Sequence, residues 1–110
     1  GENIYPEEID VYFDFLNDFS SGYCTAGYQD QVTLFVSPKD YDNFEETECF
    51  AQIRKVNAGL PMNKKVTKLY AFHDPLPRTG KGEVARFQMA HVLEERADGV
   101  KEIKMKGRNV

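Results

Sequence analysis

One segment, residues 32–36, constrains the fold more than any other, because both of its faces are apolar. Its sequence, VTLFV, alternates aliphatic side chains with threonine and phenylalanine, and successive side chains of a strand point to opposite faces of a sheet. Both faces therefore need at least partial cover from other elements. With residues 23–26 before it and a turn around residues 27–31, this segment predicts a β-hairpin.

Helical spacing of apolar residues predicts one helix before the hairpin and one after it. The first should begin at Pro6, which is tolerated at a first helical position, and end near residues 17–22, where Asn, Asp, Ser and Gly cluster. Its apolar stripe consists of Ile9, Tyr12, Phe13 and Leu16. The second helix should start at residue 44 or 45, run to residue 58 and stop at Gly59 and Pro61.

The second half of the chain predicts a strand over residues 66–72 and a third helix over residues 83–97. The inner face of that helix is expected to consist of Val84, Phe87, Ala90 and His91. The last ten residues fit either a tail strand or a frayed end. The order of elements predicts one α+β domain over residues 1–110, with a small, largely antiparallel sheet covered by about three helices.

Composition supports a folded domain and argues against several other classes. Hydrophobic residues make up 41% and charged residues 29% of the chain, which allows a packed core. No stretch approaches the ~20 apolar residues of a membrane span, and the acidic start does not resemble a signal peptide. Cys24 and Cys49 lack the spacing of a zinc site, so we expect free thiols, a reducing compartment and a cytoplasmic protein.

Charge is distributed unevenly along the chain. Residues 1–53 contain 12 acidic residues and one basic residue, Lys39, whereas residues 54–86 contain eight basic residues and two acidic ones. This basic block can concentrate phosphates, a nucleotide or nucleic acid, although a solvated face of the protein also explains it. Nucleic acid is the least favoured partner, because the pI is near 5.2 and no aromatic-interleaved recognition motif is present.

Residues 75–86, PLPRTGKGEVAR, carry the strongest chemical signal. Two prolines restrict the backbone, and two glycines permit conformations that other residues resist. A loop here could bring Arg78, Lys81 and Arg86 onto one phosphate, although a generic surface turn has the same composition. The spacing of a Walker loop is absent, and no Ser or Thr follows Lys81.

Two motifs of the chain resemble the adenylate-forming superfamily, which contains acyl-CoA synthetases, peptide-synthetase adenylation domains and luciferases. The family's closing motif, Pro-x-Thr-x-x-Gly-Lys-x-x-Arg, is matched at Pro77, Thr79, Gly82 and Arg86. The start, GENIYPEEID, is similar to the segment after the family's hinge, with matches at Gly1, Ile4, Pro6, Glu8 and Ile9. The Asn-Ile-Tyr-Pro run and the Arg-Phe pair after the loop look most like long-chain fatty acid–CoA ligases.

The resemblance implies that the chain is the small C-terminal domain of a ligase, inactive alone, whose large N-terminal domain belongs to the same protein. In the family, the full enzyme joins a carboxylate to ATP, releases pyrophosphate, and then passes the acyl group to coenzyme A. The small domain rotates between these steps. Its closing-motif loop serves adenylation, and its strand near Gly1 approaches the pantetheine arm. ATP with Mg²⁺, a fatty acid and coenzyme A are therefore expected substrates of the full enzyme, and none is held tightly by this domain.

One position departs from the family pattern. Glu83 occupies the slot of the catalytic lysine, and a carboxylate cannot donate to a phosphate oxygen and repels an anionic adenylate. Lys81 is a possible substitute if the loop shifts. Thr79 and Gly82 match loop-shaping positions, and Arg86 matches a position that contacts phosphate or the other domain. A catalytically degenerate homologue with a binding or regulatory role is therefore the alternative to an active ligase.

Other residues with reactive or aromatic side chains have ordinary interpretations. His73 and Asp74 fit a strand end better than an acid–base pair, and His91 fits a packing histidine. The two cysteines fit small hydrophobic residues. Core and hinge packing is expected of Tyr5, Tyr12, Phe13 and Phe19, and helix-start charge of Glu7, Glu8 and Asp10.

Overall fold

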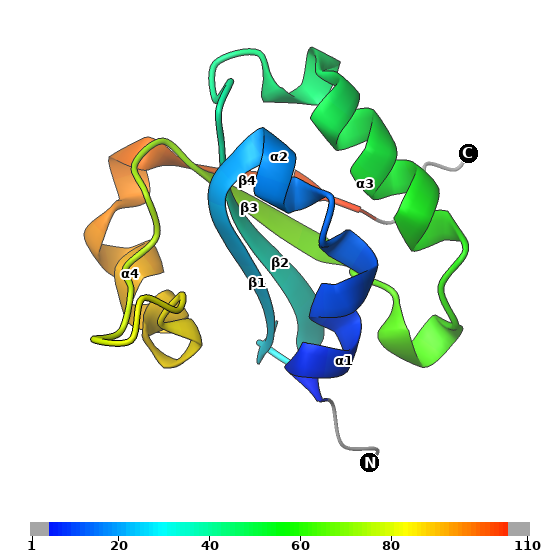
Figure 1. The fold of residues 1–110 in the computed structure, drawn as a ribbon, viewed down its shortest axis with the longest axis horizontal. Helices are drawn as coiled ribbons and strands as arrows, with labels where there is room; N and C mark the ends of the chain where they lie inside the picture. Colours follow the sequence, from blue (N-terminus) through cyan, green and yellow to red (C-terminus); the bar gives the residue numbers. More distant parts are fainter. Residues whose placement is uncertain (1–4, 106–110) are drawn as a thin grey trace.

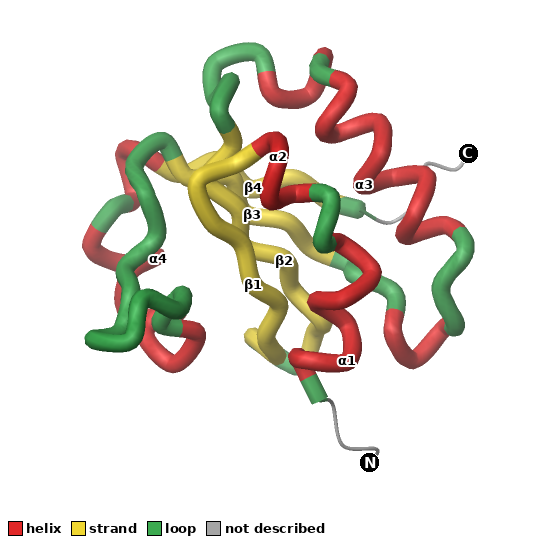
Figure 2. Tube along the Cα trace, in the orientation of Figure 1, coloured by secondary structure: helices red, strands yellow, loops and turns green. Residues whose placement is uncertain are grey.

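The computed structural model describes residues 5–105, which form a four-stranded sheet with helices on both faces (Figure 1, Figure 2). The strands are β1 (Ser20–Tyr28), β2 (Gln31–Pro38), β3 (Lys68–Phe72) and β4 (Val100–Lys104). The helices are α1 (Pro6–Asp10), α2 (Leu16–Phe19), α3 (Glu48–Ala58) and α4 (Met89–Glu95), and several single 3₁₀ turns lie between them. The expected α+β class is confirmed.

The sheet is mixed, with the strand order β1-β2-β3-β4. β1 pairs with β2, and β3 with β4, in antiparallel fashion, whereas β2 and β3 are parallel, with Leu34 opposite Leu69. The parallel pair arises because α3 lies between β2 and β3 and carries the chain back along the sheet. The expected antiparallel character therefore holds for two of the three pairings, and β4 shows that the tail-strand alternative was the right one over Val100–Lys104.

Alternate residues of the central strands face two separate cores. Leu34 and Val36 pack with residues of α1, α2 and α3, whereas Phe35 packs with residues of α4. Figure 1 shows α4 on one side of the sheet and the other three helices on the opposite side. The first core includes Ile9, Phe13, Leu16, Phe44, Ile53, Val66, Leu69 and Ala71. The second consists of Cys24, Phe35, Tyr70, Phe72, Leu76, Met89 and Val92. The prediction that both faces of residues 32–36 are covered is confirmed.

The single helix expected to start at Pro6 and end near residues 17–22 is wrong. The chain instead forms α1, a 3₁₀ turn over Val11–Phe13 and, after a further turn, α2. Phe13 and Leu16 are both fully buried along this path. Hydrogen bonds of single turns, from the Asn17 N–H to Asp14 O at 3.1 Å and from the Asp18 N–H to Phe15 O at 3.0 Å, stand where a continuous helix would have its own.

The second helix is confirmed but begins later than expected. The residues Phe44–Glu46 form a separate 3₁₀ turn, and α3 starts at Glu48. Thr47 sets this start, because its side chain accepts a hydrogen bond from the Phe50 N–H at 3.2 Å. The helix ends at Gly59, as the sequence predicts.

The third helix, expected over residues 83–97, is wrong in its first turn and in its inner face. Val84 pairs with Arg78 in an antiparallel bridge, which holds the chain extended, and α4 begins only at Met89. Because the helix starts later, its buried face consists of Met89 and Val92, with Ala85 buried just before it. Three of the residues expected inside, Phe87, Ala90 and His91, are exposed.

The turn between β1 and β2 offers a test of the hairpin geometry. Gln29 and Asp30 both have positive φ angles, 54° and 63°, as a type I′ turn requires, and glycine is favoured at its second position. We expect Asp30→Gly to raise the free energy of unfolding by about 0.5–1 kcal/mol, because glycine adopts this conformation without a Cβ penalty. Urea denaturation of both chains measures the difference, and an unchanged or lower stability would contradict it.

Candidate functional site

Residues 77–86, which we call the closing loop, fold as a tight hairpin. The Thr79 N–H donates to Glu83 O at 2.7 Å, and the Gly82 N–H donates to Thr79 O at 2.9 Å. Gly82 has a φ of +86°, in the region that favours glycine. Thr79 Oγ1 also accepts a hydrogen bond from the Lys81 N–H at 3.2 Å. Thr79 and Gly82 therefore shape this loop, in keeping with the positions they match in the family motif.

Lys81 and Glu83 lie at the exposed tip of the closing loop. Within residues 5–105, neither side chain has a hydrogen-bond or ion-pair partner. The backbone of Glu83 is held by the hydrogen bond from Thr79, so Lys81 cannot take the place of Glu83 unless that hydrogen bond breaks. The tip thus offers one ammonium and one carboxylate two residues apart.

Arg78 ties the closing loop to the edge strand β1. Its Nη1 donates to Gly82 O and its Nη2 to Ser21 O, both at 2.6 Å. Gly22 makes this approach possible, because a Cβ there would stand 3.0 Å from Arg78 Nη2. Both terminal nitrogens of Arg78 are therefore used to hold the loop. The expectation that Arg78, Lys81 and Arg86 meet on one phosphate is wrong for this arrangement of the loop.

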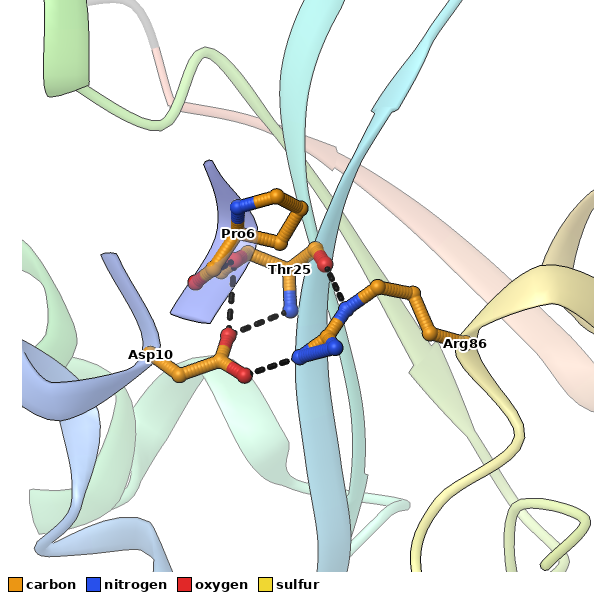
Figure 3. A network of polar contacts seen from close by, with 4 residues as sticks. All are labelled: Pro6, Asp10, Thr25 and Arg86. Carbon is orange, nitrogen blue, oxygen red and sulfur yellow. Dashed lines mark hydrogen bonds and ion pairs between the residues drawn. The ribbon is translucent and has the colours of Figure 1, made fainter. Parts of the chain in front are cut away.

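Arg86 forms a second tie, which we call the Arg86 clamp and define as Asp10, Thr25 and Arg86 (Figure 3). Arg86 Nε donates to Thr25 O at 2.8 Å, and its Nη2 forms a hydrogen-bonded ion pair with Asp10 Oδ2. The other oxygen, Asp10 Oδ1, accepts from the Thr25 N–H at 2.8 Å and from the Thr25 hydroxyl at 2.7 Å. The hydroxyl also lies 3.1 Å from Pro6 O.

The charge state of the clamp follows from these contacts. Burial of Arg86 opposes its charge, but the hydrogen bond and the negative charge of Asp10 outweigh this effect and raise the pKa of Arg86. The side chains of Arg86 and Asp10 are 28% and 20% exposed, so the pair is shielded from water on most sides. The guanidinium of Arg86 therefore stays charged within the clamp.

Sequence reasoning missed the role of Asp10. Its position near the start of the longer helix expected from Pro6 suggested a helix-start charge, yet its carboxylate binds β1 and the closing loop. No sequence feature distinguishes Thr25 from any other threonine in a strand. No local pattern of the sequence identifies Arg86, 76 residues away, as the partner of Asp10.

Much of the basic block between residues 54 and 86 is used inside the fold. Lys65 Nζ donates to the carbonyl groups of Asn57 and Ala58 and thereby caps α3. Further contacts include the ion pairs of Lys64 with Glu8 (4.0 Å) and Lys68 with Glu102 (3.7 Å), and the guanidinium of Arg54 over the ring of Phe50 (5.8 Å). The block is therefore dispersed over several elements, and Lys81 stands apart at the loop tip.

The other residues singled out from the sequence lie away from the loop tip. His73 Nδ1 lies 3.0 Å from Asp74 Oδ1 in an exposed pair at the end of β3. His91 was expected to be a packing residue, which is wrong: it is exposed and pairs with Glu95 at 2.9 Å. The core packing expected of Phe13 is confirmed, whereas Tyr5 and Tyr12 are exposed.

Both cysteines are buried free thiols. Burial raises the pKa of Cys24 to about 12 and that of Cys49 to about 11. Thiolate is the reactive form, so both side chains are unreactive near neutral pH and fit the prediction of small hydrophobic residues. Among residues 5–105, no group of three or more His, Cys, Asp or Glu side chains is placed to hold a metal ion.

Comparison with known proteins identifies no relatives of this chain. No family model matches the chain, and neither the curated proteins nor the solved structures contain a match. Within the described part of the chain, no helix has the length and apolar character needed to cross a bilayer. Gly1, the residue expected on the coenzyme A side, lies outside the described residues.

Proposed function

We propose that this chain is the C-terminal domain of an ATP-dependent, AMP-forming acyl-CoA ligase that acts on fatty acids in the cytoplasm. The observation that carries the proposal is the closing loop. Residues that match the family's closing motif form an exposed hairpin whose tip is free and whose base is held to β1 by Arg78 and Arg86. A loop of this kind suits a part that enters an active site formed mainly by another domain.

The chemistry of the loop tip supports a role in adenylation in which Lys81, two residues before the position of the family's catalytic lysine, supplies the positive charge. Adenylation needs positive charge where negative charge develops on the carboxylate and phosphate oxygens. Lys81 offers an ammonium with no competing partner among the described residues, whereas Glu83 offers a charge of the wrong sign. In the proposed enzyme, Lys81 supports a slow adenylation step, and the large N-terminal domain of the same protein binds ATP with Mg²⁺ and the fatty acid.

A second candidate is a catalytically degenerate homologue with a binding or regulatory role. Glu83 favours it, because this carboxylate stands exposed at the position of the catalytic lysine without a cation to neutralise it. Such a protein would bind nucleotide and fatty acid but would form no acyl-CoA.

Activity of the full-length protein tests the proposal. We expect it to form acyl-CoA from a long-chain fatty acid, ATP and coenzyme A, and the 110-residue chain alone to form none. Binding of ATP and fatty acid without acyl-AMP or acyl-CoA would favour the degenerate homologue. A full-length protein without a Ser/Thr/Gly-rich phosphate loop in an upstream domain would overturn both candidates.

A further inference from the structure

The Arg86 clamp joins three parts of the chain that are far apart in sequence. Asp10 is the last residue of α1, Thr25 lies in the middle of β1, and Arg86 ends the closing loop. Thr25 is 15 residues from Asp10 and 61 residues from Arg86. These contacts therefore connect the helix near the chain's start to the loop near its end, across the edge of the sheet (Figure 3).

The clamp occupies a free sheet edge. In the described sheet β1 is an outer strand whose neighbour is β2. The backbone groups of an edge strand point alternately toward and away from its neighbour, and the N–H and C=O of Thr25 point away, where they meet side chains. Asp10 satisfies the N–H and Arg86 satisfies the C=O. The side chains thus take the place of a fifth strand at this residue, and they cover an edge that would otherwise be open to pairing.

Arginine is required by this geometry. Its planar guanidinium presents Nε to Thr25 O and Nη2 to Asp10 at the same time, so two bonds fix both the position and the orientation of the side chain. A lysine at residue 86 has a single ammonium without a planar fork. It would keep the charge but lose the fixed orientation.

We propose that Arg86 is a positioning residue for adenylation, which holds the closing loop and α1 as one rigid unit so that the tip with Lys81 reaches a fixed place. The inference rests on the proposed function for its catalytic consequence. Arg86 itself contacts neither substrate nor the reacting atoms: it acts through the loop whose base it holds. A displacement of about 1 Å at a catalytic group can cost about 10²-fold in rate, so a loosened loop has a measurable effect.

Two variants of the full-length protein test the clamp. Arg86→Lys keeps the charge, and Asp10→Asn keeps an acceptor for the Thr25 N–H while removing the ion pair. Asp14→Asn is the matched control, because Asp14 is an exposed acid four residues beyond Asp10 whose side chain has no contact with the loop. Each is combined with Glu83→Lys if wild-type exchange is too slow to measure.

The expected result has a kinetic and a structural part. In both variants, kcat for ATP–pyrophosphate exchange falls about tenfold while KM for ATP stays within about twofold, and the double variant is no worse than either single one. The amide hydrogens of Thr79, Gly82 and Ala85 exchange about tenfold faster, while those of β2 and β3 do not change. The Asp14→Asn control changes neither quantity.

Three outcomes decide between the readings. Unchanged kcat and unchanged loop amides in both variants would overturn the inference. A fall in kcat that matches the folded fraction, with faster exchange throughout the sheet, would reduce Arg86 to a stabilising residue and also overturn it. A full-length protein with no exchange activity, even with Glu83→Lys, would instead reject the proposed function, and the loop amides alone would then show whether the clamp holds the loop.

Discussion

In the proposed ligase, Glu83→Lys should raise ATP–pyrophosphate exchange by the full-length protein about 10²-fold. The backbone of Glu83 is held by the hydrogen bond between Thr79 and Glu83, so a lysine at this position starts from a fixed Cα. The substitution removes a carboxylate that repels the adenylate and adds an ammonium that can donate to its oxygens. It is measured with labelled pyrophosphate at saturating fatty acid.

Two matched variants separate the causes of this gain. Glu83→Gln removes the repulsion without adding a donor, so we expect a gain of about tenfold or less. Lys81→Met in the wild type should abolish most of the remaining exchange, by about tenfold, because Lys81 is then the ammonium that serves adenylation. Thioester formation from supplied acyl-adenylate should stay within about twofold, since it relies on the other face of the domain. Robust wild-type exchange that is indifferent to Lys81→Met would contradict the impaired-loop interpretation.

Phe35→Ala should lower the free energy of unfolding of the chain by about 3–5 kcal/mol. Phe35 is fully buried in the core on the α4 side of the sheet. Its ring stacks on Tyr70 at 5.7 Å between centroids and contacts Phe72 and Tyr28 at 6.3 and 6.4 Å. An alanine leaves a cavity among three rings that cannot close on it, because the strands that carry them, β1 and β3, are held in register by β2.

Urea denaturation with an exposed phenylalanine as control checks this prediction. Phe87 is 79% exposed, so Phe87→Ala should change the stability by no more than about 0.5 kcal/mol. A loss of 3–5 kcal/mol is a large share of the 5–15 kcal/mol that is usual for a domain, and partial unfolding at 25 °C is within the expected range. A loss below about 1 kcal/mol at Phe35 would show that the core on the α4 side contributes little.

Local patterns predicted those parts of the fold where the deciding contacts are close in sequence. The alternation in residues 32–36 indicated a strand covered on both faces, and Gly59 indicated the end of α3. The patterns failed where distant contacts took over. The helix expected from Pro6 is divided into α1, a 3₁₀ turn and α2, and α4 starts late because Val84 pairs with Arg78.

In the candidate site, too, contacts close in sequence were predictable and contacts distant in sequence were not. The motif spacing was enough to single out the closing loop, and the loop's shape then follows from Thr79 and Gly82, which lie within a few residues of each other. The sequence alone does not show which of Lys81, Arg78 and Arg86 has its charged group bound within the fold. Only the folded chain distinguishes them, because two have acceptors on β1 and one does not.

The sequence by itself determined the α+β class, the two-sided central strand and the place of the loop over residues 77–86, because each depends on periodicity or spacing within about 15 residues. The tertiary structure alone decided the parallel pairing of β2 with β3 and the meeting of Asp10, Thr25 and Arg86. Contacts between residues as far as 76 positions apart leave no local pattern, since each partner's side chain is compatible with several other surroundings. The folded domain, and not the local sequence, therefore decides which acceptors the cations of the closing loop reach.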